Sequence, residues 1–343
     1  MLLIHYYNMS YFKYYDHWFT QMQTFLIIET VLYLIDCLNM IFYIWVLFSA
    51  KQFHFNFNLV SGTQYIIHLI DNLAILVMRF QWFLGFIDDT NLESNLIFNW
   101  SMTCSIFCIV SAMCALPLSI LERFFASVFL KDYETNRRPY ISFILVFLLN
   151  AFGVLGAIAL QNKSNTVYVV LALMLPNGCA LALNSFLRGW NIKKYEECHS
   201  NLAIRFRRIG KYSLAKRFQI SENIKSLHML YVIIIYMGFM NTLLVLSVLC
   251  SSFDSSPERQ SLCSMILDIS IFFYSFALPQ IMTRFCRKWR AQTYAFKLKF
   301  GCPKPSSIEP LRDTFGSDMD ENVSMNRYFD QLKQSWDKEF DEV

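Results

Sequence analysis

The stretch Trp100–Leu121, WSMTCSIFCIVSAMCALPLSIL, runs for 22 residues without one charged side chain. A helix needs about 20 mainly apolar residues to cross a hydrocarbon core roughly 30 Å thick, so this stretch predicts a membrane span. Six further stretches are long and apolar enough: Phe25–Phe48, Leu59–Phe83, Tyr140–Leu160, Val167–Leu187, His228–Cys250 and Leu262–Thr283. The sequence therefore predicts an all-α membrane protein, a seven-transmembrane helix bundle over residues 25–283.

The composition supports lipid as the solvent. Hydrophobic residues make up 55% of the 343 residues and charged residues only 16%, against roughly 25% charged residues in soluble domains. A soluble protein of this length would have to bury seven such segments in one core, and single cores stop growing near this size. These two observations exclude a soluble fold.

The positive charges predict the orientation. Of the 30 Lys and Arg residues, 26 fall in the loops after the first, third and fifth spans or after the seventh, and Arg79 lies inside the second span. Only Lys13, Lys163 and Arg259 fall on the other side. Cytoplasmic loops carry the excess of basic residues. We therefore expect a multi-pass protein of the plasma membrane with its N-terminus outside, its C-terminus cytoplasmic, and anionic lipid rather than nucleic acid as the partner of its basic side.

Both ends of the chain yield predictions. The tail 1–24 is expected outside, where the triplet that begins with Asn8 is an acceptor for glycosylation. Residues 284–300 place four aromatic side chains on one helical face, which is typical of an amphipathic helix on the inner leaflet; they are Phe285, Trp289, Phe296 and Phe300. Residues 301–343 become acidic and polar, so we expect this cytoplasmic tail to be largely disordered.

Ionisable residues at membrane depth usually face the bundle interior and carry function. Polar residues share one helical face in three spans: Glu29, Tyr33, Asp36 and Tyr43; Gln64, His68, Asp71 and Arg79; and Asp268, Ser275 and Pro279. One interpretation is a water-filled pocket between the first, second and seventh spans, where Asp36, Asp71, Arg79 and Asp268 bind a ligand. The other is a network between helices that fixes their packing. The sequence leaves both open.

The outer loops are too short for a folded domain, so the expected ligand is a small molecule in the outer half of the bundle. The sequence leaves open whether a disulfide forms between two of the cysteines Cys104, Cys250 and Cys263. The sequence lacks His-Glu-x-x-His and Gly-x-Ser-x-Gly motifs, and its six His residues are scattered. We therefore predict no enzyme activity, no catalytic residue, no metal and no cofactor.

Two motifs occur on the predicted cytoplasmic side. Glu122 and Arg123 end the third span. They either form an ionic contact that breaks on activation or lie at an ordinary interface where the Arg side chain reaches toward water. The stretch Tyr212–Asn223 before the sixth span mixes basic and apolar residues at helical spacing. It suits an acidic or helical partner, or else a solvated helix.

The stretches Glu122–Ala126, Lys131–Glu134 and Arg217–Asn223, the last reading RFQISEN, resemble the nematode serpentine chemoreceptors of class epsilon. The resemblance implies a G-protein-coupled receptor of chemosensory neurons and other cells, with sensory cilia as one location. By analogy with rhodopsin-like receptors it implies that Arg123 engages a heterotrimeric G protein. The coupling residues that it implies are Glu122, Arg123, Arg217, Phe218, Gln219, Glu222 and Asn223.

Some features depart from the rhodopsin-like pattern. The last span has Leu278-Pro279-Gln280 where that pattern has Asn-Pro-x-x-Tyr, and the sixth span lacks a Trp-x-Pro motif. The details of activation are therefore expected to differ. A ligand-gated channel or transporter is the alternative, which the orientation and the lack of a repeat between the halves disfavour. A membrane hydrolase would need a His-rich metal cluster. Ligand identity, G-protein subtype and homo- or hetero-dimer formation stay open.

Overall fold

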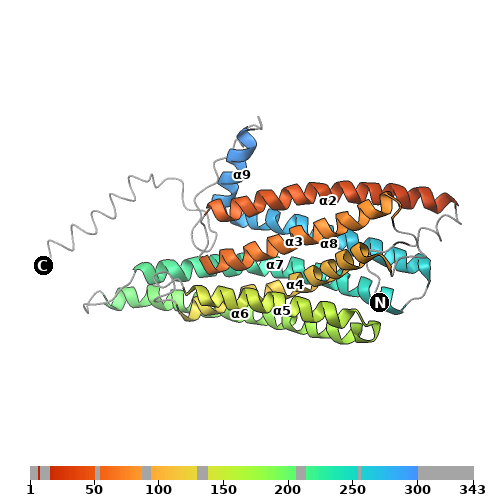
Figure 1. Ribbon diagram of the computed structural model, residues 1–343. Coiled ribbons are helices and arrows are strands. Elements are labelled where there is room, and N and C mark those ends of the chain that lie inside the picture. Colours follow the sequence, from red (N-terminus) through yellow and green to blue (C-terminus); the bar gives the residue numbers. More distant parts are fainter. Residues whose placement is uncertain are drawn as a thin grey trace. The chain divides into compact units, whose positions relative to one another are not determined.

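The computed structural model describes residue 7 and residues 16–50, 55–86, 94–129, 138–205, 214–253 and 256–299. Seven of its helices are long and apolar enough to cross a membrane, and no strand occurs in these ranges (Figure 1). The seven helices are α2 Asp16–Ala50, α3 Phe55–Phe83, α4 Leu96–Val128, α5 Pro139–Leu160, α6 Thr166–Arg205, α7 Leu214–Phe253 and α8 Pro257–Phe285. A short helix α9, Arg287–Lys299, follows. The predicted seven-helix fold class is confirmed.

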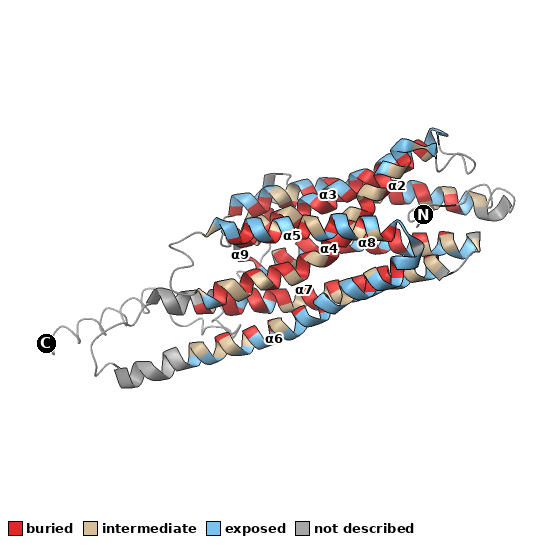
Figure 2. Cartoon of the chain, turned by 60° about the horizontal axis from the view of Figure 1, so that its bottom comes forward, coloured by how far each residue is buried: buried red, intermediate tan, exposed pale blue. Residues whose placement is uncertain are grey.

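Helix α4 forms the centre of the bundle. It packs against α3, α5, α6 and α7, while α2 packs against α3 and α8. Two-thirds of the most apolar stretch of α4 is buried, whereas only 22% of the corresponding stretch of α6 is. Figure 2 shows exposed and intermediate residues along most of α6. Large apolar side chains such as Leu38, Phe147 and Leu175 are more than two-thirds exposed. Such a surface is costly in water and suits lipid.

Glycines allow α5 to approach α4 closely. A Cβ atom added to Gly153 would lie 2.0 Å from Ser111 Oγ, and one added to Gly156 would lie 2.6 Å from Val110 Cγ1. Both distances are far below van der Waals contact. Small residues at such interfaces let the backbones of membrane helices come close enough to pack.

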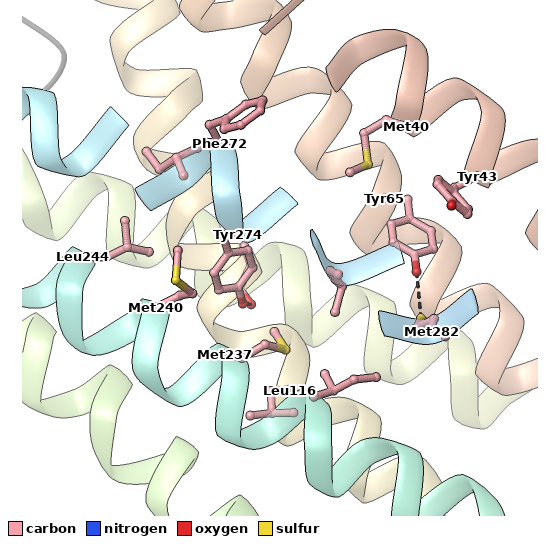
Figure 3. Close-up of a cluster of buried hydrophobic side chains, with 14 of the residues drawn as sticks. Met40, Tyr43, Tyr65, Leu116, Met237, Met240, Leu244, Phe272, Tyr274 and Met282 are labelled. Carbon is pink, nitrogen blue, oxygen red and sulfur yellow. Dashed lines mark hydrogen bonds between the residues drawn. The ribbon is translucent and has the colours of Figure 1, made fainter. Parts of the chain in front are cut away.

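Methionine and tyrosine side chains fill the middle of the bundle (Figure 3). Tyr274 of α8 lies beside Met237 and Met240 of α7, and its hydroxyl donates a hydrogen bond to the carbonyl of Ala112. The hydroxyl of Tyr65 donates to Met282 Sδ at 2.7 Å. Since Met side chains adapt to irregular gaps, this core fixes the helices less rigidly than a core of branched residues would.

The helices extend beyond the predicted spans. Helix α2 begins at Asp16 inside the predicted tail, α6 continues to Arg205, and α7 begins at Leu214 rather than His228. The apolar stretch must match the lipid thickness, whereas a helix continues into water wherever its residues allow. The predicted helical extension before the sixth span is thus present. Asn8 and the tail 301–343 lie outside the described residues.

The structure has a helix in most of the range predicted at 284–300, α9, but it begins at Arg287, so that Phe285 ends α8 instead of belonging to the predicted helix. A second predicted aromatic residue is also used differently. Trp289 is fully buried, with its ring 6.2 Å from that of Tyr43 and 6.4 Å from that of Tyr65. This residue therefore anchors the first turn of α9 to α2 and α3 instead of facing lipid. Contact of the rest of α9 with the inner leaflet stays a prediction.

Candidate functional site

The three predicted polar faces all point into the bundle. Each of their residues is buried, among them Glu29, Asp36, Asp71, Arg79 and Asp268. They gather in three groups: one near the end of α3 that carries Arg79, here called the Arg79 end of the bundle, and two deeper ones around Asp36 and Asp71. The opposite end is called the Arg123 end.

At the Arg79 end, one arginine joins three helices. Arg79 Nη2 of α3 lies 2.8 Å from Glu29 Oε1 of α2 and 2.6 Å from Asp268 Oδ2 of α8. All three side chains are at most 5% exposed. Charge-assisted hydrogen bonds of this kind are roughly twice as strong as neutral ones. We call Glu29, Arg79 and Asp268 the outer cluster, since the charge pattern predicts that this end lies outside the cell.

A tyrosine from the N-terminal segment inserts into the outer cluster. The hydroxyl of Tyr7 donates a hydrogen bond to Asp268 Oδ2 at 2.5 Å, and the guanidinium carbon of Arg79 lies 4.8 Å from the centre of its ring. Burial, followed by the charges of Asp268 and Glu29, raises the pKa of Tyr7 well above its usual value. The hydroxyl therefore remains protonated and keeps its role as a donor.

Asp36 is the acceptor of a second network, which also joins α2, α3 and α8. Asn72 donates to it at 2.9 Å and Asn39 at 3.2 Å, and the hydroxyl of Ser275 donates as well. Asn39 in turn accepts from Gln280 at 3.3 Å. The side chain of Asp36 is thus committed to holding helices together in this arrangement.

Asp71 borders a small central cavity. Residues of α3, α4, α7 and α8 line it: His68, Asp71, Ile109, Ala112, Met113, Leu244, Ile271 and Tyr274. Ser105 donates to Asp71 Oδ1 at 2.5 Å, while His68 Nε2 is buried without a hydrogen-bond partner among the described residues. The cavity volume of about 10 Å³ is roughly that needed by one water.

The structure therefore distributes the four predicted ligand residues. Arg79 and Asp268 meet in the outer cluster, Asp36 holds its own network, and only Asp71 reaches the cavity. The network interpretation describes the present contacts of Asp36, Arg79 and Asp268. Ligand binding by the four residues stays a prediction, and the cavity lies between α3, α4, α7 and α8 rather than between α2, α3 and α8.

At the Arg123 end, the predicted acid–arginine pair is formed. Arg123 Nε lies 2.5 Å from Glu122 Oε2 and its Nη2 lies 2.9 Å from Oε1, so the guanidinium holds both carboxylate oxygens. The guanidinium carbon of Arg123 lies 4.7 Å from the centre of the Phe57 ring. Arg123 is only 5% exposed, which keeps it out of reach of any soluble partner in this arrangement.

The sequence reasoning missed a stripe of asparagines along α6. Asn177 donates to the carbonyl of Met113 of α4 at 3.1 Å, Asn184 to the carbonyl of Leu227 of α7 at 3.5 Å, and Asn191 to Ser127 Oγ of α4 at 3.1 Å. The signal was available, because residues seven apart share one face of a helix. Neutral amides stand out less than charges in an apolar sequence.

The other predicted coupling residues lie at the start of α7. Arg217, Phe218, Gln219 and Glu222 belong to this helix, but their side chains lie outside the described part; Asn223 is buried. No disulfide joins Cys104, Cys250 and Cys263 to one another in the structure. No group of three His, Cys, Asp or Glu residues in the described ranges is placed to hold a metal ion.

The comparisons with known proteins match this architecture. The family model of the Sre G protein-coupled chemoreceptors matches residues 2–337. Serpentine receptor class epsilon-12 of Caenorhabditis elegans is 65% identical over 339 residues, covering 98% of this chain and 99% of that protein. The chain belongs to the Sre family. Serpentine receptor class epsilon-8 and class epsilon-2 of the same nematode are each 24% identical, over 86% and 85% of the chain and 85% and 84% of their own lengths.

The resemblance drawn from the sequence is thereby confirmed. The chain is a multi-pass membrane protein of a nematode chemoreceptor family. Sre membership disfavours the channel or transporter alternative. The outer cluster, the Asp36 network and the Glu122–Arg123 pair are then the polar features of an Sre bundle on which a mechanism must be built.

Proposed function

We propose that this Sre protein is a G-protein-coupled chemosensory receptor for a small molecule. The Arg79 end faces outside and receives the ligand, and the Arg123 end faces the cytoplasm and engages a heterotrimeric G protein. Family membership and the one-sided distribution of basic residues support this orientation. The observation that carries the proposal is the buried Glu122–Arg123 pair, which withholds a cation from the basic side of the molecule.

Activation in this proposal exposes Arg123. The guanidinium has to leave both carboxylate oxygens of Glu122 and move from the buried position where it now lies. The nearby bond between Asn191 and Ser127 ties α6 to α4. Displacing the cytoplasmic end of α6 would break this bond and open a path beside Arg123. The partner that then binds Arg123 supplies the negative charge that Glu122 gives up.

The small size of the central cavity explains how a ligand could favour a different arrangement of the helices. A cavity of about 10 Å³ has room for roughly one water, so a larger molecule binds there only after the lining helices separate. A ligand shifts an equilibrium only by binding the two arrangements with different affinities. A cavity closed in one arrangement and open in another meets that requirement, and His68 Nε2 supplies a buried polar atom for the ligand to contact.

The test compares arginines at the two ends. The receptor is expressed in cultured cells and screened against a chemical panel with calcium and cAMP readouts, and responses are then measured for Arg123→Gln and Arg217→Gln. We expect both variants to reach the surface and lose the response, whereas Arg259→Gln, an exposed arginine at the Arg79 end, keeps it. A full response from Arg123→Gln would contradict G-protein engagement there. Ligand-evoked current that persists with G proteins blocked would support a channel instead.

A further inference from the structure

We propose that the outer cluster is a binding site for phenols, occupied in this structure by the side chain of Tyr7. The inference rests on the proposed function only in taking the Arg79 end as the ligand-receiving end. Tyr7 and Asp268 are 261 positions apart in the sequence, so this contact joins the tyrosine to a distant helix, α8. The described Tyr7 is not part of a helix.

The surroundings of Tyr7 match each part of a phenol. Asp268 Oδ2 accepts from the hydroxyl at 2.5 Å. Arg79 lies over the ring face at 4.8 Å, where the ring is electron-rich and attracts a cation. Phe25 contacts the ring in an edge-on arrangement at 6.2 Å, which is a favoured geometry for aromatic pairs.

The rest of the wall is apolar and holds one further polar group. Met22 and Leu26 are buried beside Tyr7, with Trp82 and Met265 packed against them. Glu29, which is 4% exposed, has its Oε2 atom buried without a hydrogen-bond partner among the described residues. That atom is a buried polar group that a second polar group of a ligand could contact and that Tyr7 does not reach.

Tyr7 acts in this proposal as a tethered competitor. A short linker holds an attached group at an effective concentration in the millimolar range. If the Tyr7 side chain binds the site with an intrinsic dissociation constant of about 0.1 mM, it fills the site roughly ten to one, and a free phenol then binds roughly tenfold more weakly than to an empty site, because only the unoccupied fraction is competent. Removing the Tyr7 side chain should restore the intrinsic affinity. A phenol that displaces Tyr7 would exchange one occupant of Asp268 for another and release the N-terminal segment.

The test measures binding directly on purified receptor, without a G protein. Binding of 4-ethylphenol and of ethylbenzene is followed by the ligand-dependent rise in Tm for the wild type, Tyr7→Ala and Tyr7→Phe. We expect 4-ethylphenol to act on Tyr7→Ala at about one-tenth of the concentration needed for the wild type, with Tyr7→Phe in between because its ring still occupies the site. Ethylbenzene, which lacks the hydroxyl, should act on none of them at these concentrations.

Two controls separate this site from general effects. Tyr168→Ala removes a tyrosine that is 74% exposed and should behave as the wild type, while adding Asp268→Asn to Tyr7→Phe should weaken phenol binding. Equal concentrations for the wild type, Tyr7→Phe and Tyr7→Ala, or an equal response to ethylbenzene, would overturn the proposal. Phenol binding without any cellular signal would instead count against the proposed receptor function and leave this site standing.

Discussion

Replacing Glu122 by Gln should raise the basal activity of the receptor. In the structure the two oxygens of Glu122 hold two nitrogens of Arg123 at 2.5 and 2.9 Å. A Gln side chain of the same shape keeps one acceptor oxygen and turns an NH₂ group toward the other guanidinium nitrogen. One of the two charge-assisted bonds is therefore lost, and a donor faces a donor in its place.

The size of the effect follows from the bond that is lost. A hydrogen bond to a charged group contributes about 1.5–3 kcal/mol, which corresponds to a change of roughly 10- to 150-fold in the ratio of the two arrangements. A minor arrangement populated at about 1% would rise to roughly 9% at the lower limit. Arg123 is 5% exposed, and a buried cation without its full partner is destabilised. The substitution therefore destabilises the arrangement seen in the structure, in which Arg123 is buried.

The assay is basal signalling in cells that express equal amounts of receptor at the surface, measured by antibody to an N-terminal tag. We expect Glu122→Gln to signal at least several-fold above the wild type without ligand. Glu258→Gln is the matched control, because Glu258 is exposed and lies in the first turn of α8 at the Arg79 end. Basal signalling at the wild-type level with normal surface delivery would refute the idea that this pair restrains Arg123.

Three further predictions concern stability in detergent. Gly156→Ala should lower the Tm by a few degrees relative to Gly178→Ala. A Cβ at position 156 would lie 2.6 Å from Val110 Cγ1, whereas one at position 178 meets nothing within 4 Å, and overpacking costs about 1–3 kcal/mol. Equal Tm values for the two variants would contradict the close α4–α5 contact. Asp36→Ala should lower the Tm by several degrees, since the amides of Asn39 and Asn72 lose their acceptor and a buried unpaired group costs about 1–3 kcal/mol, whereas Ser275 keeps the backbone carbonyls of α8 as acceptors; an unchanged Tm would disprove the network. A reducing agent should leave the Tm unchanged, because none of the described cysteines forms a disulfide, and a drop on reduction would reveal a bridge.

The sequence was sufficient to predict the buried polar faces of α2, α3 and α8. Apolar length identifies a span, and the helical period places Glu29, Asp36 and Tyr43 on one side of α2. Both signals are local, so they survive without knowledge of neighbouring helices. The structure confirms that these residues are inside.

The partners of these residues could not be predicted in the same way. Arg79 and Asp268 are 189 positions apart, and which of several buried acids meets the arginine depends on the tilt and depth of three helices. The docking of Tyr7 had no periodic signal at all, because the residue lies outside the helices. The position of the central cavity depends on the summed volumes of side chains from four helices, which no single stretch records.

The two ionic groups and the core between them suggest how the ends of this bundle communicate. Helix α3 carries Arg79 at one end and, at the other, Phe57, whose ring contacts Arg123. In a buried ion pair, the attraction between the charges roughly equals the free energy lost when both are removed from water. The net stabilisation is therefore small, and exchanging one partner for another can change which arrangement of the helices is favoured. The core between them is rich in adaptable side chains such as Met237 and Met240. We infer that the polar groups define discrete arrangements while this core accommodates more than one, which is the combination that a switch requires.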